Sequence, residues 1–387
     1  MVMLAALSAL APLGVDMYLP AFPAMAEEFG TSASAVQLTL TAFLIGLALG
    51  QLVVGPLSDR YGRRPLLIVG SLLCVLATVA CAMAPSVELL ALFRFVQGFT
   101  GAAGVVLSRA VVSDRAQGAR AAKMFSLLIV INGVAPVIAP LLGGATIGLF
   151  GWRGVFWVLA GISLAILVGV IAWVPESHPV ERRSTGGFAT MVHDARQVLG
   201  NRSYLGYTLA FAFGFAVMFA YISASPFVLQ NVHGLSTGWY VAAFTSNALG
   251  LVFMSALNAK LVERIDPRTL LRGGVGLLGL FSALMLVNAL IGPHLWVTIV
   301  VLWGAVSSLG LVIANATTLA LAEAQHAAGT GSAVLGALQF GLAAVVSPLV
   351  GLGGEFTAVP MALVMLASAV VAALALSAVK VPSGAER

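Results

Sequence analysis

The sequence predicts an all-α membrane protein of twelve transmembrane helices, arranged as two pseudo-symmetric bundles of six helices. Hydrophobic residues make up 60% of the 387 residues and charged residues only 9%, with a mean hydropathy of +1.05. A soluble domain carries about a quarter charged residues. Each bilayer crossing takes about 20 mostly apolar residues, so the chain has room for about twelve crossings joined by short connections.

Apolar runs, each ended by a polar interruption, define the expected helices. The one long polar stretch, 175–203, is expected to be a cytoplasmic linker between an N-terminal bundle, 1–174, and a C-terminal bundle, 204–387. Asp16 and Pro20 interrupt the first helix near its end. The expected helices lie at 3–23, 34–54, 65–83, 87–112, 124–149, 152–174, 204–231, 236–260, 270–291, 295–322, 330–350 and 359–379.

Basic residues are distributed asymmetrically over the connections between these helices. All Lys and Arg residues except Arg94, Arg109 and Arg153 lie in alternate connections, in the linker or at the C-terminus. Basic residues in short loops are retained on the cytoplasmic side. We therefore expect a multi-pass protein of the bacterial inner membrane with both termini in the cytoplasm.

The two halves of the sequence resemble each other. Residues 57–60, Leu-Ser-Asp-Arg, correspond to residues 261–264, Leu-Val-Glu-Arg, and Pro140 in the fifth helix corresponds to Pro348 in the eleventh. Transporters commonly bind their substrate between such repeats. The correspondence indicates duplication and favours a transporter.

Other classes of protein fit the sequence poorly. The net charge of +5 does not indicate nucleic-acid binding, because the basic residues lie between hydrophobic runs and not on a soluble face. None of the three lysines follows a glycine, as the phosphate-binding segment of an ATP-driven pump requires. The five histidines lie in loops or near helix ends, which argues against an intramembrane enzyme. We expect no catalytic site, metal or cofactor.

The connection between the second and third helices, residues 55–65, carries several charges. Asp59, Arg60, Arg63 and Arg64 stand there among glycines. A basic loop that only sets the topology explains the arginines but not the aspartate. A carboxylate at a helix end can pair with a cation or a helix N-terminus. We expect a latch that breaks when the two halves move.

This loop resembles the signature of the major facilitator superfamily, and the resemblance covers the whole chain. Within the superfamily, the sequence is similar to the twelve-helix drug/proton antiporters of the Bcr/CflA type, named for bicyclomycin and chloramphenicol resistance. Supporting segments are 16–20 (Asp-Met-Tyr-Leu-Pro), Arg94 with Gln97, and the glycines and prolines of the fifth helix. Ala139 stands where many members have glycine.

Asp16 is the only carboxylate well inside an expected helix, and intramembrane ionisable residues are usually functional. Arg94 is expected at about the same depth. The superfamily fold implies that their helices are neighbours, so both charges could face one cavity. Burial favours the neutral form of a carboxyl group and a nearby arginine favours the ionised form. We expect Asp16 and Arg94 to couple proton and substrate, with a purely structural ion pair as the alternative. Arg94 could instead be a structural cation bonded to helix carbonyls.

The fifth helix is rich in small residues and prolines. Close packing alone would explain them. The resemblance implies that this helix bends at the interface between the halves and prevents leakage. The residues concerned are Gly133, Pro136, Pro140 and Gly143.

Isolated polar and aromatic residues inside apolar runs are candidates for the substrate cavity. Each alone is more often a helix-packing contact, but together they describe a mixed pocket for neutral or amphipathic molecules. The candidates are Tyr18, Gln37, Gln97, Asn132, Tyr221, Ser225, Asn247, Trp303, Asn315 and Gln339.

These features predict a secondary active efflux transporter that works by alternating access. The expected cargo is a small drug-like molecule, such as a phenicol or bicyclomycin-type antibiotic, exported in exchange for protons. The alternative is an exporter of an endogenous metabolite such as a sugar or nucleoside. We expect a monomer in the lipid bilayer.

Overall fold

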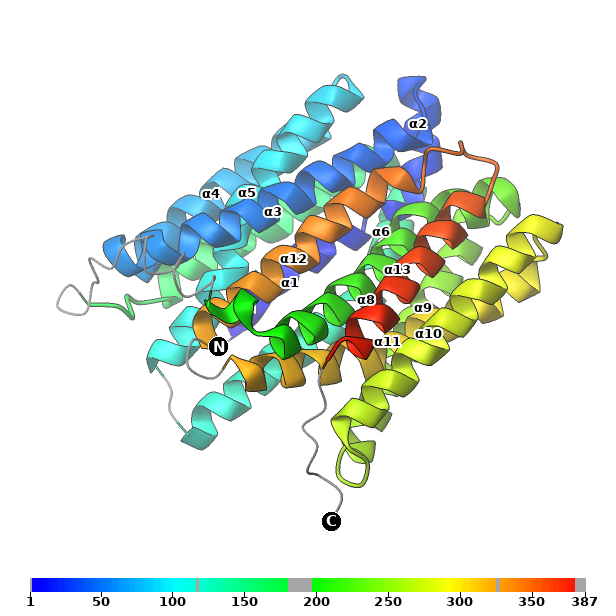
Figure 1. Ribbon diagram of the computed structural model, residues 1–387. Helices are drawn as coiled ribbons and strands as arrows, with labels where there is room; N and C mark the ends of the chain where they lie inside the picture. Colours follow the sequence, from blue (N-terminus) through cyan, green and yellow to red (C-terminus); the bar gives the residue numbers. More distant parts are fainter. Residues whose placement is uncertain (1, 116–117, 180–196, 325–327, 380–387) are drawn as a thin grey trace, which may run out of the picture. The chain divides into compact units, whose positions relative to one another are not determined.

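The computed structural model describes residues 2–115, 118–179, 197–324 and 328–379, which contain helices and no strand (Figure 1). Much of the predicted linker, with Arg182, Arg183 and Arg196, lies outside these residues. The elements are α1 (Val2–Asp16), η1 (Leu19–Ala21), α2 (Phe22–Phe29), α3 (Ala33–Tyr61), α4 (Arg63–Ala82), α5 (Val87–Arg115), α6 (Gly118–Trp173), α8 (Arg202–Phe227), η3 (Val228–Val232), α9 (Thr237–Leu261), α10 (Pro267–Ile291), α11 (Leu295–Glu323), α12 (Ala328–Leu349) and α13 (Val359–Ser377).

The predicted all-helical membrane fold is confirmed. In the described part of the chain, 11 segments are long and apolar enough to cross a membrane. One of them, 133–173, contains two passages, because α6 turns at Gly151, where φ is +67°. Glycine tolerates this left-handed conformation. The junction lies between the predicted helices 124–149 and 152–174, so the described residues form twelve passages.

The first passage is broken rather than continuous. The helix α1 ends at Asp16, and η1 and α2 continue the passage to Phe29. Pro20 has no N–H group and its ring clashes with the carbonyl four residues earlier, which belongs to Asp16. Pro23 stands near the start of α2, where proline is tolerated. The predicted interruption is therefore a complete break, and the passage ends six residues later than expected at 23.

Several other helices extend beyond their predicted ends. The helix α3 continues through Pro56 to Tyr61 and stops at Gly62, where φ is +97°. Its start is capped by Ser32, whose hydroxyl group accepts from the Ala35 N–H at 3.3 Å. The apolar pattern ends before these polar turns, which is why the sequence placed the boundary earlier.

Two compact units emerge from the contacts within the chain. The first comprises 1–186, 222–246 and 347–357, and the second comprises 187–221, 247–346 and 358–387. Leu7, Leu67 and Leu107 belong to the apolar core of the first unit. Leu271 and Val312 belong to that of the second. The division into predicted bundles 1–174 and 204–387 stays a prediction.

Glycines bring α3 and α5 into close contact, and the two helices run side by side (Figure 1). A Cβ atom on Gly46 would collide with the Phe95 carbonyl oxygen, and one on Gly98 would collide with the Phe43 carbonyl oxygen. Small residues let helix backbones approach in this way in membranes. A Cβ atom on Gly55, near the C-terminal end of α3, would meet no atom within 4 Å.

Replacing Gly46 by alanine is therefore expected to lower the free energy of unfolding by about 1–3 kcal/mol, because the methyl group overpacks the contact. The matched variant Gly55→Ala is expected to raise it by up to about 1 kcal/mol, because alanine is the better helix former. Thermal unfolding of the two variants in detergent measures the difference. Equal effects of the two substitutions would contradict this packing role.

Candidate transport site

Asp16 is the last residue of α1 and lies at the break in the first passage. Its side chain is 4% exposed. Its Oδ1 atom is buried and has no hydrogen-bond partner among the described residues. The Asp16 carboxyl group thus lies inside a membrane-spanning segment with one oxygen that no described residue hydrogen-bonds.

Arg94, on α5, is fully buried and is hydrogen-bonded to the end of α1. Its Nη2 donates to the Gly14 carbonyl oxygen at 2.9 Å, and its Nη1 donates to Gln97 Oε1 at 2.6 Å. The guanidinium carbon lies 4.3 Å from the ring centroids of both Tyr18 and Phe43. Cation–π contacts of this kind stabilise a desolvated guanidinium. Arg94 is therefore held by a helix carbonyl, an amide and aromatic faces.

No ion pair joins Asp16 to Arg94 in the described part of the chain, where pairs are counted up to 4.0 Å. The alternative of a structural ion pair gains no support. The observed bond to Gly14 agrees with the alternative of a cation bonded to a helix carbonyl.

Gln97 links Arg94 to the third passage. Its Nε2 donates to Thr78 Oγ1 at 2.8 Å, and the Thr78 hydroxyl group donates to the Cys74 carbonyl oxygen at 2.7 Å. All three side chains are buried. The network spans α4 and α5 and holds the Gln97 amide in the orientation that receives Arg94.

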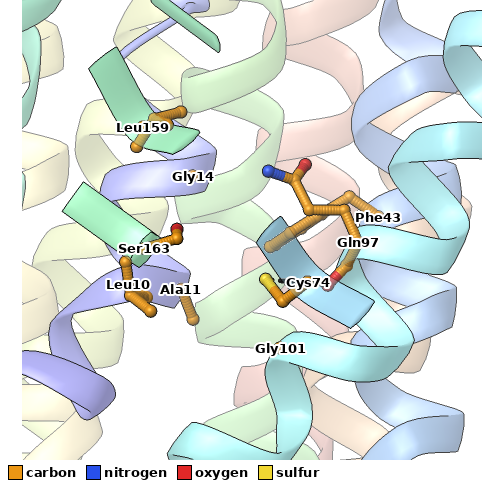
Figure 2. A pocket seen from close by; sticks show the side chains of 9 residues that line it. All are labelled: Leu10, Ala11, Gly14, Phe43, Cys74, Gln97, Gly101, Leu159 and Ser163. Atoms are coloured by element: carbon orange, nitrogen blue, oxygen red, sulfur yellow. Dashed lines mark hydrogen bonds between the residues drawn. The ribbon is translucent and has the colours of Figure 1, made fainter. Parts of the chain in front are cut away.

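A cavity of about 20 Å³ lies beside this network (Figure 2). Phe43, Cys74, Gln97 and Ser163 line it together with Leu10, Ala11, Gly14, Gly101 and Leu159. It has room for a water molecule. Sites for drug-sized ligands span about 300–1,000 Å³, so this cavity belongs to the packing around Arg94 and not to substrate binding.

The glycine-rich part of α6 packs directly against the break in the first passage. A Cβ atom on Gly143 would collide with the Met17 carbonyl oxygen, and one on Gly144 would lie 2.8 Å from a methyl carbon of Val241. Pro136 and Pro140 lie inside the same helix. A Cβ atom on Gly133 would meet no atom within 4 Å, so this glycine is not needed for close packing. The structure therefore places Gly143 next to Asp16 in the fold.

The predicted cavity residues fall into separate groups. Tyr18, 3.3 Å from Thr39 Oγ1, lies with Arg94 and Gln97 in the first unit. Tyr221 and Asn247 bond each other at 2.8 Å in the second unit.

Of the other six candidates, four lie elsewhere, one cannot be placed, and the sixth, Gln37, donates to the Ser223 carbonyl oxygen at 3.0 Å. Ser225 lies 3.5 Å from the Tyr240 hydroxyl group, and Asn315 donates to Asn258 at 2.7 Å. Trp303 is 39% exposed and Gln339 is half-buried. The side chain of Asn132 lies outside the described residues.

The charged loop between α3 and α4 is tied to two acidic residues that sequence reasoning missed. Arg63 pairs with Asp59 at 2.7 Å and with Asp114 at 3.1 Å. The Glu176 carboxylate accepts from the backbone N–H groups of Arg63 and Arg64 at 2.9 and 3.2 Å. Glu176 therefore caps the start of α4.

The remaining arginines of the loop have separate contacts. The Arg60 guanidinium carbon lies 5.4 Å from the ring centroid of Tyr61. Arg64 Nη2 donates to the Ile171 carbonyl oxygen at 2.9 Å.

Sequence reasoning also missed Gly14, Phe43 and Thr78. None of them stands next to a charged residue in the sequence, and all are residue types that commonly pack between membrane helices. Within the described ranges, no group of three or more His, Cys, Asp or Glu side chains could hold a metal ion.

Comparisons with known proteins agree with this architecture. The family described as "Major Facilitator Superfamily" matches residues 4–348. The "Uncharacterized MFS-type transporter YdgK" of Bacillus subtilis is 39% identical over 96% of this chain and 93% of its own length. The "Bicyclomycin resistance protein homolog" of Haemophilus influenzae is 31% identical over 95% of this chain and 93% of its own.

A solved structure supports the fold alone. It is a bacterial homologue of the human lysosomal transporter Spinster, described in an inward-facing and occupied conformation. The similarity has a TM-score of 0.78 with 18% identity, over 98% of this chain and 95% of the other.

Replacing Arg94 by lysine is expected to lower the free energy of unfolding by about 1–3 kcal/mol, because an ammonium group cannot bond Gln97 and Gly14 and also stack on both rings. Arg109→Lys, on the exposed side of the same helix, is the matched control. Thermal unfolding in detergent measures both. Equal stability of the two variants would show that the bonds of Arg94 carry no net stabilisation.

The second site prediction concerns Glu176, which lies outside the membrane-spanning segments. Partial burial raises the pKa of Glu176, but the backbone N–H groups of His178, Arg63, Arg64 and Ser177 outweigh it and lower the pKa below its ordinary value of 4.5. The charged form thus stabilises the folded state above pH 4.5, and this contribution is lost as the pH falls through the lowered pKa. Glu176→Gln should reduce thermal stability at pH 7, and the difference from wild type should shrink at acidic pH. A difference independent of pH would contradict the carboxylate's role.

Proposed function

The chain belongs to the major facilitator superfamily, and on that premise we propose that it exports small drug-like molecules in exchange for protons. It is a multi-pass membrane transporter. The printed name of its Haemophilus influenzae relative, a bicyclomycin resistance protein homologue, supports an antibiotic as cargo. Neutral bicyclomycin-type or phenicol molecules suit a pathway with few charged side chains.

The carboxyl group of Asp16 is the observation that carries the proposal. It is buried at a break in a membrane passage, and its Oδ1 atom has no hydrogen-bond partner in the described part of the chain. Charge in such a place is costly, and discontinuous membrane helices commonly bind coupling ions or substrate. The charge state of a carboxyl group depends on its hydration and on neighbouring charges. Asp16 therefore exchanges its proton when substrate entry changes both.

Arg94 positions this acid and supplies the positive field beside it. Its bond to the Gly14 carbonyl oxygen fixes the end of α1, its bond to Gln97 orients the guanidinium group, and Tyr18 packs against that group. No ion pair joins Arg94 to Asp16 among the described residues, and the Oδ1 atom of Asp16 has no hydrogen-bond partner there. An unpaired acid is able to take up a proton or bond a polar group of the cargo.

Alternating access would expose this acid to each side of the membrane in turn. In this proposal the bundles 1–174 and 204–387 move relative to each other. The charged loop, with Asp59, Arg60, Arg63 and Arg64, acts as a latch through the half-exposed Asp59 side chain, while the bonds of Arg63 within the first six passages stay intact. The residues of α6 that limit leakage are Gly133, Pro136, Pro140 and Gly143. The protein works as a monomer in the inner membrane with both termini in the cytoplasm.

Within each unit taken by itself, we assign substrate selection to polar side chains. Tyr18 and Gln97 lie beside Arg94, and Tyr221 and Asn247 form a bonded pair in the second unit. Hydroxyl and amide groups select cargo by hydrogen bonding without requiring it to be charged.

Replacing Asp16 by asparagine is expected to abolish proton-coupled efflux while the protein still folds, because the amide keeps the shape of the side chain but cannot carry a proton. The measurement is antibiotic susceptibility in a pump-deficient host, together with uptake of labelled drug into vesicles under a pH gradient. Expression in the membrane and an unchanged melting temperature exclude misfolding.

The control is Asp114→Asn, which removes a carboxylate outside the proposed proton site. It should keep measurable coupling to the pH gradient. If Asp16→Asn still moved a neutral drug uphill under a pH gradient, the proton-carrier assignment would fail. Chemical alteration of the labelled drug would indicate an enzyme instead.

A further inference from the structure

Three deeply buried polar residues form a hydrogen-bonded triangle that joins α3 to α8 and α12. Gln37 Nε2 donates to the Ser223 carbonyl oxygen at 3.0 Å, and the hydroxyl oxygens of Ser223 and Ser347 lie 2.8 Å apart. The Ser347 hydroxyl group completes the ring with a long bond of 3.5 Å to the Gln37 carbonyl oxygen. Gln37 is 1% exposed and both serines are fully buried. We name these three residues the polar triangle.

A glycine allows the end of α12 to approach α3 at this place. A Cβ atom on Gly351 would collide with Gln37 Oε1 and would lie 2.7 Å from Ser34 Oγ. Any larger residue at 351 would push the polar triangle apart. The close approach of the end of α12 to α3 therefore requires glycine at position 351.

Neighbouring contacts join the same segments. The rings of Phe22 and Phe227 lie 6.0 Å apart, and Gln230 Nε2 donates to the Pro20 carbonyl oxygen at 3.1 Å. Residues 222–246 and 347–357 accordingly group with residues 1–186 in one compact unit, although they belong to later helices. The polar triangle is thus the buried centre of a wider contact near the break after Asp16.

The polar triangle is incompletely satisfied. Gln37 Oε1 is buried and has no hydrogen-bond partner among the described residues. An unpaired buried oxygen weakens the closed arrangement. Pro226 and Pro348 follow the two serines closely and each removes a helical N–H donor, which makes local bending easier. A contact with these properties can open and close reversibly.

We propose that the polar triangle is a lock that closes one entrance of the transport pathway and opens once in each transport cycle. The sequence placed Gln37 in the substrate cavity, and in this proposal its amide holds the entrance shut. The opening step rests on the proposed alternating access. The existence of the lock does not depend on the identity of the cargo.

Disulfide cross-linking tests the lock without any substrate. In a Cys74→Ala/Cys81→Ala background, the pair Gly144→Cys/Val241→Cys, whose Cβ atoms would lie 3.7 Å apart, should form a disulfide in membranes when oxygen is supplied with a copper–phenanthroline catalyst. The pair Phe22→Cys/Phe227→Cys reports on the same closure and covers the case in which the first pair folds poorly. Failure of both pairs to cross-link in folded protein would overturn the proposal.

Weakening the polar triangle should reduce the closed population. Gln37→Met keeps the length of the side chain without its donor, and Ser347→Ala removes one hydroxyl group. Each should slow cross-linking about three- to tenfold, as expected for an interhelical hydrogen bond in a membrane. The matched controls are Gln51→Met on α3 and Ser225→Ala on α8. Equal rates in lock variants and controls would overturn the proposal.

The second readout is transport by the cross-linked protein. Drug efflux should stop when the disulfide forms and should return after reduction, since a closed entrance blocks the cycle. Undiminished efflux by fully cross-linked protein would also overturn the lock. If no drug is transported by any variant, the proposed export function fails, whereas the cross-linking rates still decide the lock.

Discussion

A guanidinium group buried among membrane helices needs acceptors that do not themselves belong to an intact helix. Arg94 finds one at the Gly14 carbonyl oxygen. Because α1 ends at Asp16, the carbonyl of Gly14 belongs to the last turn, where intrahelical donors are missing. The cation also lies at the negative end of the helix dipole. The break and the arginine thus stabilise each other, and together they determine the position of Asp16.

This arrangement explains which parts of the site were visible in the sequence. Asp16 and Arg94 stand out because charge is rare inside apolar runs, and Pro20 marks the break by local geometry alone. Gly14 and Phe43 were missed, since a carbonyl acceptor and an aromatic face leave no distinctive pattern in a membrane helix. Their roles depend on which helices become neighbours, and local patterns do not encode that.

The same limit applies at the charged loop and along the helix faces. Twelve passages followed from apolar length, but Glu176 lies 113 positions from the Arg63 N–H that it accepts. Trp303 illustrates a second difficulty. In a membrane protein, the faces toward lipid and toward the core are both apolar, so periodicity does not separate them. Its 39% exposure emerged only from the structure.

The charged loop and the polar triangle stabilise different kinds of contact. The observed acidic partners of Arg63, which are Asp59, Asp114 and Glu176, all lie within residues 59–176, so these bonds stiffen the first six passages and need not break when later helices move. The Asp59 side chain remains 48% exposed and keeps capacity for another partner. The polar triangle instead joins α3 to helices that follow the linker. Strong charge-assisted bonds therefore lie where rigidity is needed, and weak neutral bonds lie where α3 must separate from α8 and α12.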